Sequence, residues 1–532
     1  MNINRTIVLI CLIFVPFVFG IYSILLGQDT NWDLLNYHLY NPFAFLNNRI
    51  NFDLAPAGLQ TYFNPFLDVA YFFAVNHLHP KTVGFMLGLI QGLNFILVYK
   101  ISMHVLRDNI RGEFFSLLLA LAGLFSVGFL SEVGTTLSDS VISIFSLLSL
   151  WIIISFVGDL KGDEKPPIIF PAMCAGVLIG IGCGLKLTIS IYALSMCLSF
   201  LVLPVSWASR FKLSFFFGVF VLVGLLISGG FWMYKMWSFF GNPIFPQFNN
   251  IFQGELAAFV QMRDTRFLPN NIFEKIFYPA IFTLNPLRVN ELGYYQISWF
   301  LAYIATFILI INRSLILFKK EANQRRWNLA TGFFFAFFCI SYFIWLNVFG
   351  IYRYLIPLEM LIPVLLFVTI NYFLKGRYFN YCAILFIGVI TAVNVRGAPD
   401  YGHSEWAENV YHIDKHVLSS DPVPAAIYLS GQPLAWIIPA LNIRAPFIQL
   451  SPNIVLSDTY WQHAKSLTAG REGKSYLVLE SDTFDIAENS KIGLVKLGLI
   501  LDKDSCGWLV GYLGAAKYSY KYCEVKKGFH KP

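Results

Sequence analysis

Long apolar stretches alternate with shorter polar ones along most of the chain, and they have the length of membrane-spanning helices. A spanning helix needs about 20 mainly apolar residues. We predict eleven such helices, at roughly residues 6–26, 82–103, 113–130, 140–157, 168–185, 187–204, 213–234, 297–312, 329–347, 354–374 and 378–395. The first is too long for the apolar part of a signal peptide, and no small-x-small cleavage site follows it, so we expect it to remain as a helix.

The composition agrees with a membrane protein. Of the 532 residues, 57% are apolar and only 13% are Asp, Glu, Lys or Arg, whereas soluble domains carry about 25% charged residues. So few charges exclude a soluble enzyme, a disordered chain and a nucleic-acid-binding protein. The net charge of +7 says little about partners, because Lys and Arg accumulate in cytoplasmic loops for topological reasons.

The positive residues of the short loops predict the orientation. Most of them fall on one side of the predicted helices, and Lys186 and Arg353 are the main exceptions on the other side. The positive-inside rule therefore places the N-terminus in the cytoplasm, and an odd number of helices places the C-terminal segment outside. We expect a multi-pass protein of the cytoplasmic (inner) membrane, with segments 27–81, 235–296 and 396–532 on the outer, periplasmic face.

The same pattern predicts two domains, a transmembrane domain at 1–396 and a soluble extracytoplasmic domain at 397–532. In the second, short apolar runs alternate with more polar stretches, which predicts a small α/β domain. Amphipathic stretches in the first outer segment, such as Leu34–Leu46 and Phe63–Phe73, are expected to lie at the membrane interface. Cys506 and Cys523 both fall in the outer domain, where an oxidising compartment allows a disulfide without requiring one.

The densest polar cluster follows the first predicted helix, at residues 28–42, and holds two carboxylates, a histidine and several amides. Carboxylates at the membrane surface are costly unless they are paired or used. If the segment is helical, Asp33 and Tyr37 lie on one face. Two interpretations remain open: Asp29 and Asp33 cap local structure, or the cluster is part of a functional site.

The cluster resembles the first-loop signature of the GT-C glycosyltransferases, through Asp33-x-x-x-Tyr37-His38 directly after the first helix. This family includes the lipid-A aminoarabinose transferases and the protein O-mannosyltransferases. Its members are integral membrane enzymes that move a sugar from a polyprenyl-phosphate carrier to an acceptor on the outer face. The family usually has Glu after the Asp, whereas this chain has Leu34, so the usual pair of carboxylates is incomplete.

Further matches follow in the order of the family and on the predicted outer side. Asp139 precedes the fourth span, Lys186 ends the fifth in Gly184-Leu185-Lys186, and Arg353 opens the tenth in Tyr352-Arg353-Tyr354-Leu355-Ile356-Pro357. A softer match is Trp237…Gly241-Asn242-Pro243-Ile244-Phe245-Pro246. The resemblance covers about residues 1–360. It implies a GT-C-like bundle of about 11 transmembrane helices, with interfacial helices in the first outer loop and a small C-terminal α/β extracytoplasmic domain.

The resemblance also implies roles for these residues. Asp33 would be the catalytic base, and Asp139 would orient the acceptor, stabilise developing positive charge or help to hold a divalent cation, unless it only caps its helix. Lys186 and Arg353 would bind the phosphate, since Lys and Arg bind phosphate well. Trp32, Tyr37 and His38 are the other candidate substrate-binding residues. The metal site, if there is one, stays unknown.

The reaction implied is displacement of a polyprenyl phosphate from the anomeric carbon, with inversion. The partners are the lipid-linked sugar donor, membrane lipid, and a glycan, lipid or protein acceptor. The resemblance makes no cofactor certain, and a divalent cation is the one candidate. Two alternatives stay open, a polysaccharide ligase or polymerase and a transporter or flippase of lipid-linked sugars. Transporters place charges near the bilayer midplane, often in repeated halves, whereas these charges lie at predicted helix ends and no repeat is evident.

Overall fold

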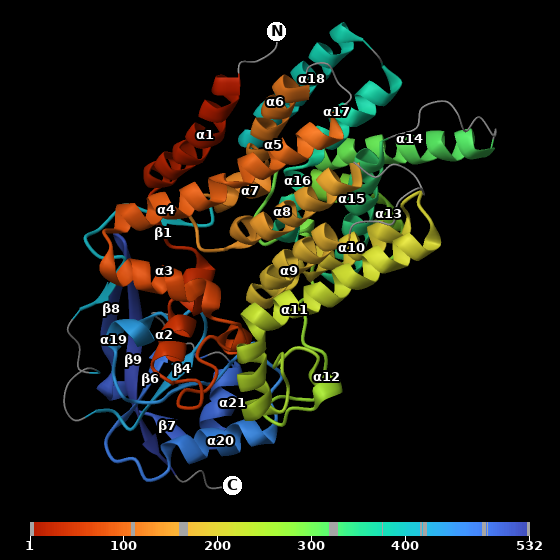
Figure 1. Cartoon of the computed structure of the whole chain (residues 1–532). Helices are drawn as coiled ribbons and strands as arrows, with labels where there is room; N and C mark the ends of the chain where they lie inside the picture. The colour runs from red at the N-terminus through yellow and green to blue at the C-terminus, as the bar shows by residue number, and fades with distance from the viewer. Residues whose placement is uncertain are drawn as a thin grey trace.

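The computed structural model describes residues 5–107, 112–158, 169–318, 328–374, 376–414, 418, 423–480, 486 and 488–528. A bundle of long helices forms one end of the molecule, and a domain built on a mixed β-sheet forms the other (Figure 1). The bundle helices are α1 (Arg5–Leu26), α4 (Pro80–Gly92), α5 (Asn94–Val105), α6 (Gly112–Leu124), α7 (Val127–Glu132), α8 (Asp139–Gly158), α9 (Phe170–Leu185), α10 (Ser190–Leu201), α11 (Trp207–Phe240), α14 (Ser298–Phe318), α15 (Leu329–Val348), α16 (Ile356–Glu359), α17 (Ile362–Phe373) and α18 (Arg377–Val395).

The predicted spanning segments coincide one for one with apolar helices. Within the described residues, six helical stretches are long and apolar enough to cross a membrane, and α4 with α5 forms one of them. A seventh is a pair bent by 50°, Tyr352–Glu359 and Ile362–Phe373, and the four shorter apolar helices match the remaining predictions. The chain is therefore a polytopic helical membrane protein, as the apolar pattern predicts.

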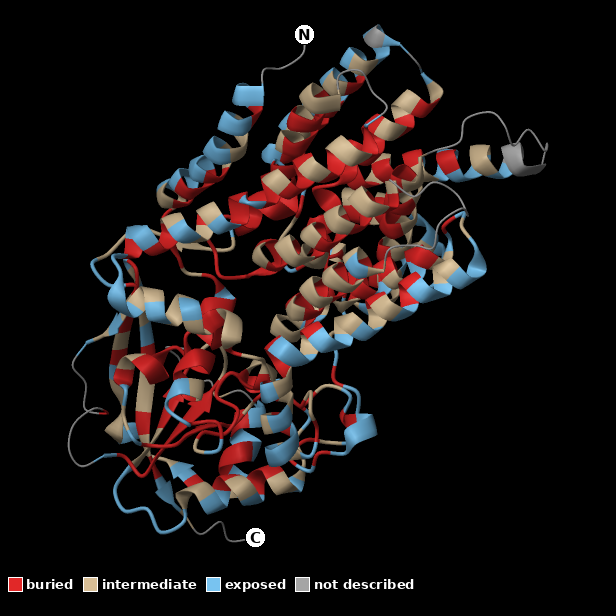
Figure 2. Cartoon of the chain, in the orientation of Figure 1, coloured by how far each residue is buried: buried red, intermediate tan, exposed pale blue. Residues whose placement is uncertain are grey.

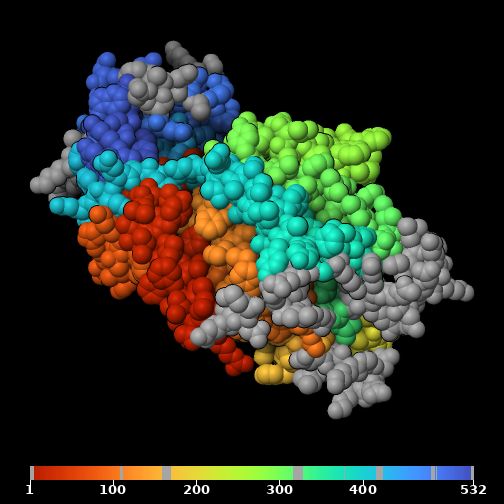
Figure 3. Space-filling view, turned by 90° about the horizontal axis from the view of Figure 1, so that it is seen from above, coloured from red at the N-terminus to blue at the C-terminus, as the bar shows by residue number. Residues whose placement is uncertain are grey.

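Helices α9 and α11 pack closely because small residues line their contact. A Cβ at Gly180 of α9 would lie 2.2 Å from the carbonyl oxygen of Val221, and one at Gly224 of α11 would lie 2.1 Å from that of Val177. Small residues at such spacings let membrane helices approach through their backbones. In contrast, α1 lies at the edge of the bundle with much of its surface exposed (Figures 2 and 3). The α9–α11 contact fixes the end of α9, where Lys186 follows.

Short elements connect the bundle to the sheet domain. The first connecting segment contains β1 (Gln28–Asp29), a π-helical turn η1 (Leu34–His38), α2 (Tyr40–Leu46), η2 (Gly58–Tyr62) and α3 (Phe66–His77). These include the two stretches predicted to be amphipathic. The segment after α11 contains α12 (Asn249–Phe252), α13 (Ile272–Leu284) and η5 (Pro286–Arg288), and the short turns η4 (Leu187–Ile189) and η6 (Tyr352–Leu355) precede α10 and α16.

The C-terminal domain is an α/β domain, as predicted. Its sheet has the order β3-β8-β9-β6-β4-β5, with β7 paired to β9. Strand β4 is parallel to β5 and β6, and the other pairings are antiparallel. The elements are β2 (His403–Ser404), β3 (Tyr411–Ile413), β4 (Ala426–Ser430), α19 (Ile437–Leu441), β5 (Phe447–Gln449), α20 (Asp458–Thr468), β6 (Ser475–Leu479), α21 (Glu488–Leu497), β7 (Leu499–Leu501), η8 (Lys503–Ser505), β8 (Gly507–Leu513) and β9 (Ala516–Lys527). Cys506 and Cys523 form a disulfide, which resolves the question the sequence left open.

The sheet domain and the first connecting segment share one hydrophobic core. Strand β1 pairs with β2, and the backbone of Leu54 forms a β-bridge with Ile448 of β5. Buried side chains between residues 34 and 62 join those of the sheet in a single cluster, which appears in Figure 2 as a continuous red region. The site described below is therefore positioned from both sides, by the bundle and by the sheet domain.

Candidate active site

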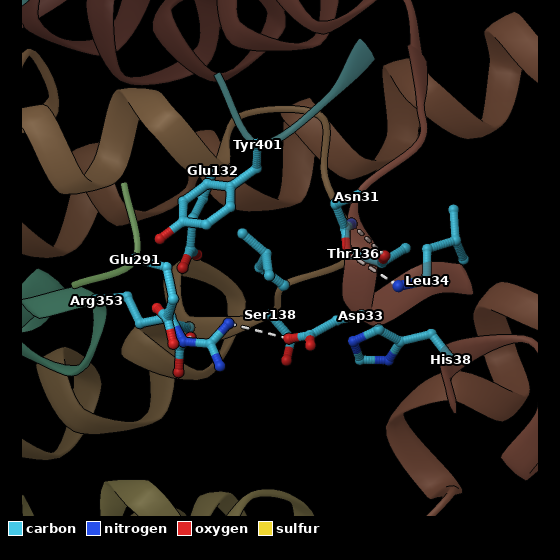
Figure 4. A network of polar contacts seen from close by, with 12 residues as sticks. Asn31, Asp33, Leu34, His38, Glu132, Thr136, Ser138, Glu291, Arg353 and Tyr401 are labelled. Atoms are coloured by element: carbon cyan, nitrogen blue, oxygen red, sulfur yellow. Dashed lines mark hydrogen bonds and ion pairs between the residues drawn. The ribbon is translucent and has the colours of Figure 1, made fainter. Parts of the chain in front are cut away.

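Four charged side chains from distant parts of the chain meet at one place. Arg353 Nη1 lies 2.9 Å from Asp33 Oδ2, and Lys186 Nζ lies 2.7 Å from Asp139 Oδ1. Arg353 Nε also lies 3.8 Å from Asp139 Oδ2, so the arginine connects the two carboxylates. Figure 4 shows Arg353 reaching toward Asp33. We name Asp33, Asp139, Lys186 and Arg353 the charged cluster.

Each member of the charged cluster stands at the end of a helical element. Asp33 directly precedes η1, and Asp139 is the first residue of α8. Lys186 follows the last residue of α9, and Arg353 lies in η6, where the chain turns into the bent pair of helices. The helix ends thus hold the backbone of all four residues close together. The long side chains of Lys186 and Arg353 then extend to the carboxylates of Asp139 and Asp33.

The cluster is largely shielded from solvent, which makes its pairing necessary. The side chains of Asp139 and Asp33 are 5% and 9% exposed, and those of Lys186 and Arg353 are 16% and 21% exposed. A buried charge without a partner is strongly destabilising. Burial acts to raise the pKa of Asp33, but the charge and hydrogen bond of Arg353, together with the charge of Lys186, outweigh it, so the pKa of this carboxyl is lower than usual. Asp33 is therefore an ionised carboxylate near neutral pH.

A second layer of hydrogen bonds fixes the loop before Asp139. The carboxylate of Asp29 accepts from the backbone N–H and the hydroxyl of Thr136, both at 2.8 Å. Lys186 Nζ donates to the carbonyl of Leu137 at 2.7 Å and to Ser138 Oγ at 3.2 Å. Ser138 itself has a φ of +69°, a conformation that non-glycine residues rarely adopt. Asp29 and Lys186 together hold the strained turn that presents Asp139.

Glu132 is a part of this site that the sequence did not reveal. Its Oε2 accepts the backbone N–H of Ser140 at 2.8 Å, so Glu132, from the end of α7, caps the first turn of α8. Burial and the nearby charge of Asp139 raise the pKa of Glu132 to about 8. Glu132 holds the helix end, and Asp139 is left to pair with the cations. In the sequence, Glu132 could have been recognised as a candidate because it is a carboxylate between two apolar stretches.

The other candidate residues lie beside Asp33 in the chain and differ in exposure. Tyr37 and His38 are buried, and their rings are tilted by 38° with centroids 4.1 Å apart. The Tyr37 hydroxyl donates to Asp33 Oδ2 at 3.4 Å, and His38 Nδ1 lies 2.7 Å from Asp68 Oδ1 in α3. Trp32 is 42% exposed. The structure thus places Tyr37 and His38 next to Asp33 of the charged cluster and leaves Trp32 partly exposed.

The capping interpretation fits Asp29 better than Asp33. Asp29 Oδ1 accepts the backbone N–H of Asn31 at 3.0 Å, which closes a local turn. Asn31 Oδ1 in turn accepts the N–H of Leu34 at 2.9 Å, at the start of η1. Asp33 forms no side-chain cap of that turn, and its carboxylate is directed to Arg353 and Tyr37.

The chemistry available at the site is that of carboxylates and cations. Among the described residues, no group of three or more His, Cys, Asp and Glu side chains is placed to hold a metal ion. Lys186 pairs with Asp139, and Arg353 lies between Asp139 and Asp33, so the two cations neutralise both carboxylates. The arrangement offers two carboxylates able to accept protons or hydrogen bonds, and two cations able to bind an anion.

Comparison with known proteins finds similar solved structures. No family model matches the chain, and no curated protein matches it. The chain is similar to solved structures of ArnT from Cupriavidus metallidurans, in the apo state (13% identity, 98% of each chain, TM-score 0.45) and bound to undecaprenyl phosphate (14%, 96% of this chain and 97% of that one, TM-score 0.44). It is also similar to the arabinofuranosyltransferase AftD from mycobacteria (13%, all of this chain and 40% of that one, TM-score 0.48).

Proposed function

We propose that the protein is a GT-C-like glycosyltransferase that moves a sugar from a polyprenyl-phosphate donor to an acceptor on the outer face of the cytoplasmic membrane. The observation that supports this most directly is the charged cluster. Two carboxylates and two cations from four helix ends meet in one shielded place beside the tyrosine and histidine of the first connecting segment. A transferase with a lipid-phosphate donor needs both kinds of group within reach of one anomeric carbon.

The cations supply the site for the leaving group. A donor phosphate is attracted to Lys186 and Arg353, which in the resting protein neutralise Asp139 and Asp33. As the phosphate takes over these contacts, Asp33 loses its strongest partner and becomes free to accept a hydrogen bond from the acceptor hydroxyl. The charge that develops on the departing phosphate is stabilised by the same two cations. Donor binding therefore precedes, and enables, activation of the acceptor.

The carboxylates supply the chemistry at the acceptor. Asp33 takes the proton of the acceptor hydroxyl as its oxygen attacks the anomeric carbon, and Asp139 orients the acceptor or stabilises positive charge on the sugar ring. A single displacement of this kind inverts the anomeric centre. The acceptor is a glycan, a lipid or a protein, and the polysaccharide ligase or polymerase reaction differs from this one only in the acceptor.

The donor site is tested by the binding of undecaprenyl phosphate to the purified protein in nanodiscs. We expect saturable binding that falls at least about tenfold in Lys186→Ala and in Arg353→Ala, the loss expected when a charge-assisted contact is removed. Undecaprenol, which lacks the phosphate, is the control ligand and should bind at least about tenfold more weakly for the same reason. Equal binding of the alcohol and the phosphate would contradict a phosphate site at Lys186 and Arg353.

The reaction is tested in cells with and without the protein. Mass spectrometry of lipid-linked sugars and of envelope glycans should show a polyprenyl-phosphate sugar accumulating, and one glycan modification missing, when the protein is absent. Movement of the lipid-linked sugar across the bilayer, with no transfer in purified liposomes, would instead identify a transporter. Unchanged lipid-linked sugars and glycans would overturn the proposal.

Asp139→Asn is expected to lower the turnover number about 100-fold. The variant keeps the size of the side chain and its place at the start of α8, while it removes the charge that Lys186 faces. A positioned charge that acts in the transition state contributes on that scale. Steady-state kinetics in liposomes would measure it, with the sugar donor that accumulates in cells lacking the protein. An unchanged turnover number would reduce Asp139 to a helix cap.

A further inference from the structure

An unusual backbone turn brings a histidine to the charged cluster. Residues Leu34–His38 form a π-helical turn, in which residues five apart in sequence are hydrogen-bonded neighbours. In a regular α-helix, His38 would point well away from Asp33, because five residues are about 1.4 turns. Here the two side chains lie side by side (Figure 4), and the imidazole is close enough to act electrostatically on the carboxyl of Asp33. Single π-helical turns of this kind occur frequently at functional sites.

A second carboxylate fixes the state of the histidine. His38 Nδ1 lies 2.7 Å from Oδ1 of Asp68, and the two side chains are 3% and 9% exposed. An ionised carboxylate only accepts hydrogen bonds, so Nδ1 carries a proton toward Asp68, and whenever the ring is neutral its lone pair is on Nε2. Nε2 is buried and has no hydrogen-bond partner among the described residues. A buried acceptor without a partner is costly, and this one is beside the carboxylate proposed to take a proton.

We propose that His38, held by Asp68, receives the proton that Asp33 takes from the acceptor, so that the two form a proton relay leading away from the reacting centre. This inference rests on the proposed glycosyltransferase function. The acceptor oxygen bonds to the anomeric carbon as the bond from that carbon to the phosphate oxygen breaks. The phosphate leaves with the electron pair, and the proton passes from the acceptor oxygen to Asp33 and then to Nε2 of His38.

The surroundings of the imidazole favour such a relay. Asp33 and Tyr37 lie beside it on its own segment, and Asp68 contacts it from α3, while Lys186 and Arg353 of the bundle act on the carboxyl of Asp33. Protonated His38 would therefore stand between two carboxylates, with Asp68 in direct contact. Asp33 has a lowered pKa, so it does not retain a proton well, and passing the proton on restores it for the next turnover.

His38 acts through Asp33, and Asp68 acts through His38, so both are positioning residues. Their variants are therefore tested by a measurement that would not change if the two residues only supported the fold. With the sugar donor that accumulates in cells lacking the protein, we expect His38→Gln to lower kcat about 100-fold, the lower end of the roughly 10²- to 10⁴-fold contribution of a proton-transfer step. KM for the donor should stay nearly constant. His77→Gln, an exposed histidine at the end of α3, is the matched control and should retain wild-type kinetics.

The pH dependence of kcat distinguishes the relay from simple support of the fold. A protonated imidazole cannot accept another proton, so wild-type activity should fall toward acid pH. Asp68→Asn removes the charge that stabilises the protonated ring, so we expect its acid limb at lower pH, with a reduced plateau. Added imidazole should restore activity several-fold in His38→Ala and have no effect on His77→Ala.

The outcomes separate the two proposals. An acid limb that stays in place in Asp68→Asn, together with no rescue of His38→Ala by imidazole, would overturn the relay while leaving the transferase intact. If the wild-type protein transfers no sugar from the accumulated donor, the proposed function itself is wrong.

Discussion

Asp33→Asn is expected to abolish sugar transfer while the protein stays folded and inserted in the membrane. Asparagine matches the shape of the side chain but cannot accept a proton from the acceptor, and proton transfer by a positioned group contributes about 10²- to 10⁴-fold. The variant also leaves Arg353 without its charge partner at 2.9 Å. We therefore expect a loss of at least about 10³-fold in kcat, near the upper part of that range. Transfer from the purified donor in liposomes measures it.

Two controls isolate the charge of Asp33 from its place in the fold. Asp458→Asn changes an exposed carboxylate of α20 that is 85% exposed, and it should leave both kcat and the melting temperature unchanged. Binding of undecaprenyl phosphate to Asp33→Asn should be at least as tight as to wild type, because the substitution removes a carboxylate that competes for Arg353. Wild-type transfer by the variant would exclude Asp33 as the base.

The spanning helices could be predicted because their signal is local. Each occupies one apolar stretch, and the eleven predicted segments correspond to the apolar helices of the structure. The bend between Glu359 and Ile362 could not be predicted from the apolar pattern, because the helical segments on both sides of it are apolar. The α/β character of the C-terminal domain was visible in its alternating runs, whereas its strand order depends on pairings between distant residues.

The members of the charged cluster could be predicted from the membrane side on which they fall, but the ion pairs between them could not. Lys186 and Arg353 stand out because they depart from the positive-inside pattern, and order along the chain joined them to Asp33 and Asp139. That Arg353 contacts Asp33, 320 residues away, and that Lys186 contacts Asp139 follow only from the folded chain. The π-helical turn before His38 also escaped prediction, because an α-helical face accounts for Tyr37 and not for His38.

Asp68 was missed for a simpler reason. It lies in an amphipathic helix where an acid in the first turn is ordinary, so nothing in the sequence distinguishes it from a surface residue. Its burial and its contact with His38 come from the packing of α3 against η1, within the first connecting segment. Functional residues of this kind, which act on another side chain instead of on the substrate, carry little signal in a single sequence.

Asp53→Ala is expected to destabilise the protein by about 3–5 kcal/mol, the usual loss when one partner of a buried ion pair is removed. Arg49 and Asp53 lie 2.7 Å apart with side chains 8% and 0% exposed. Arg49 also donates to the carbonyls of Ile443 and Ala445, at 3.0 and 2.7 Å, and Asp53 accepts the N–H of Phe447 at 2.9 Å. The ion pair and its hydrogen bonds thus link the first connecting segment to the sheet domain.

Thermal unfolding in detergent, read together with limited proteolysis of the sheet domain, measures this effect. Asp264→Ala is the matched control, because it breaks an Asp–Arg pair whose arginine side chain is 66% exposed, and exposed pairs contribute about 0–1 kcal/mol. The double variant Arg49→Leu with Asp53→Ala should be more stable than Asp53→Ala alone, since it leaves no buried charge without a partner. Equal melting temperatures for Asp53→Ala and Asp264→Ala would mean that the two parts are joined mainly by their shared apolar core. In that case the first connecting segment, and Asp33 with it, would be positioned by packing and not by this ion pair.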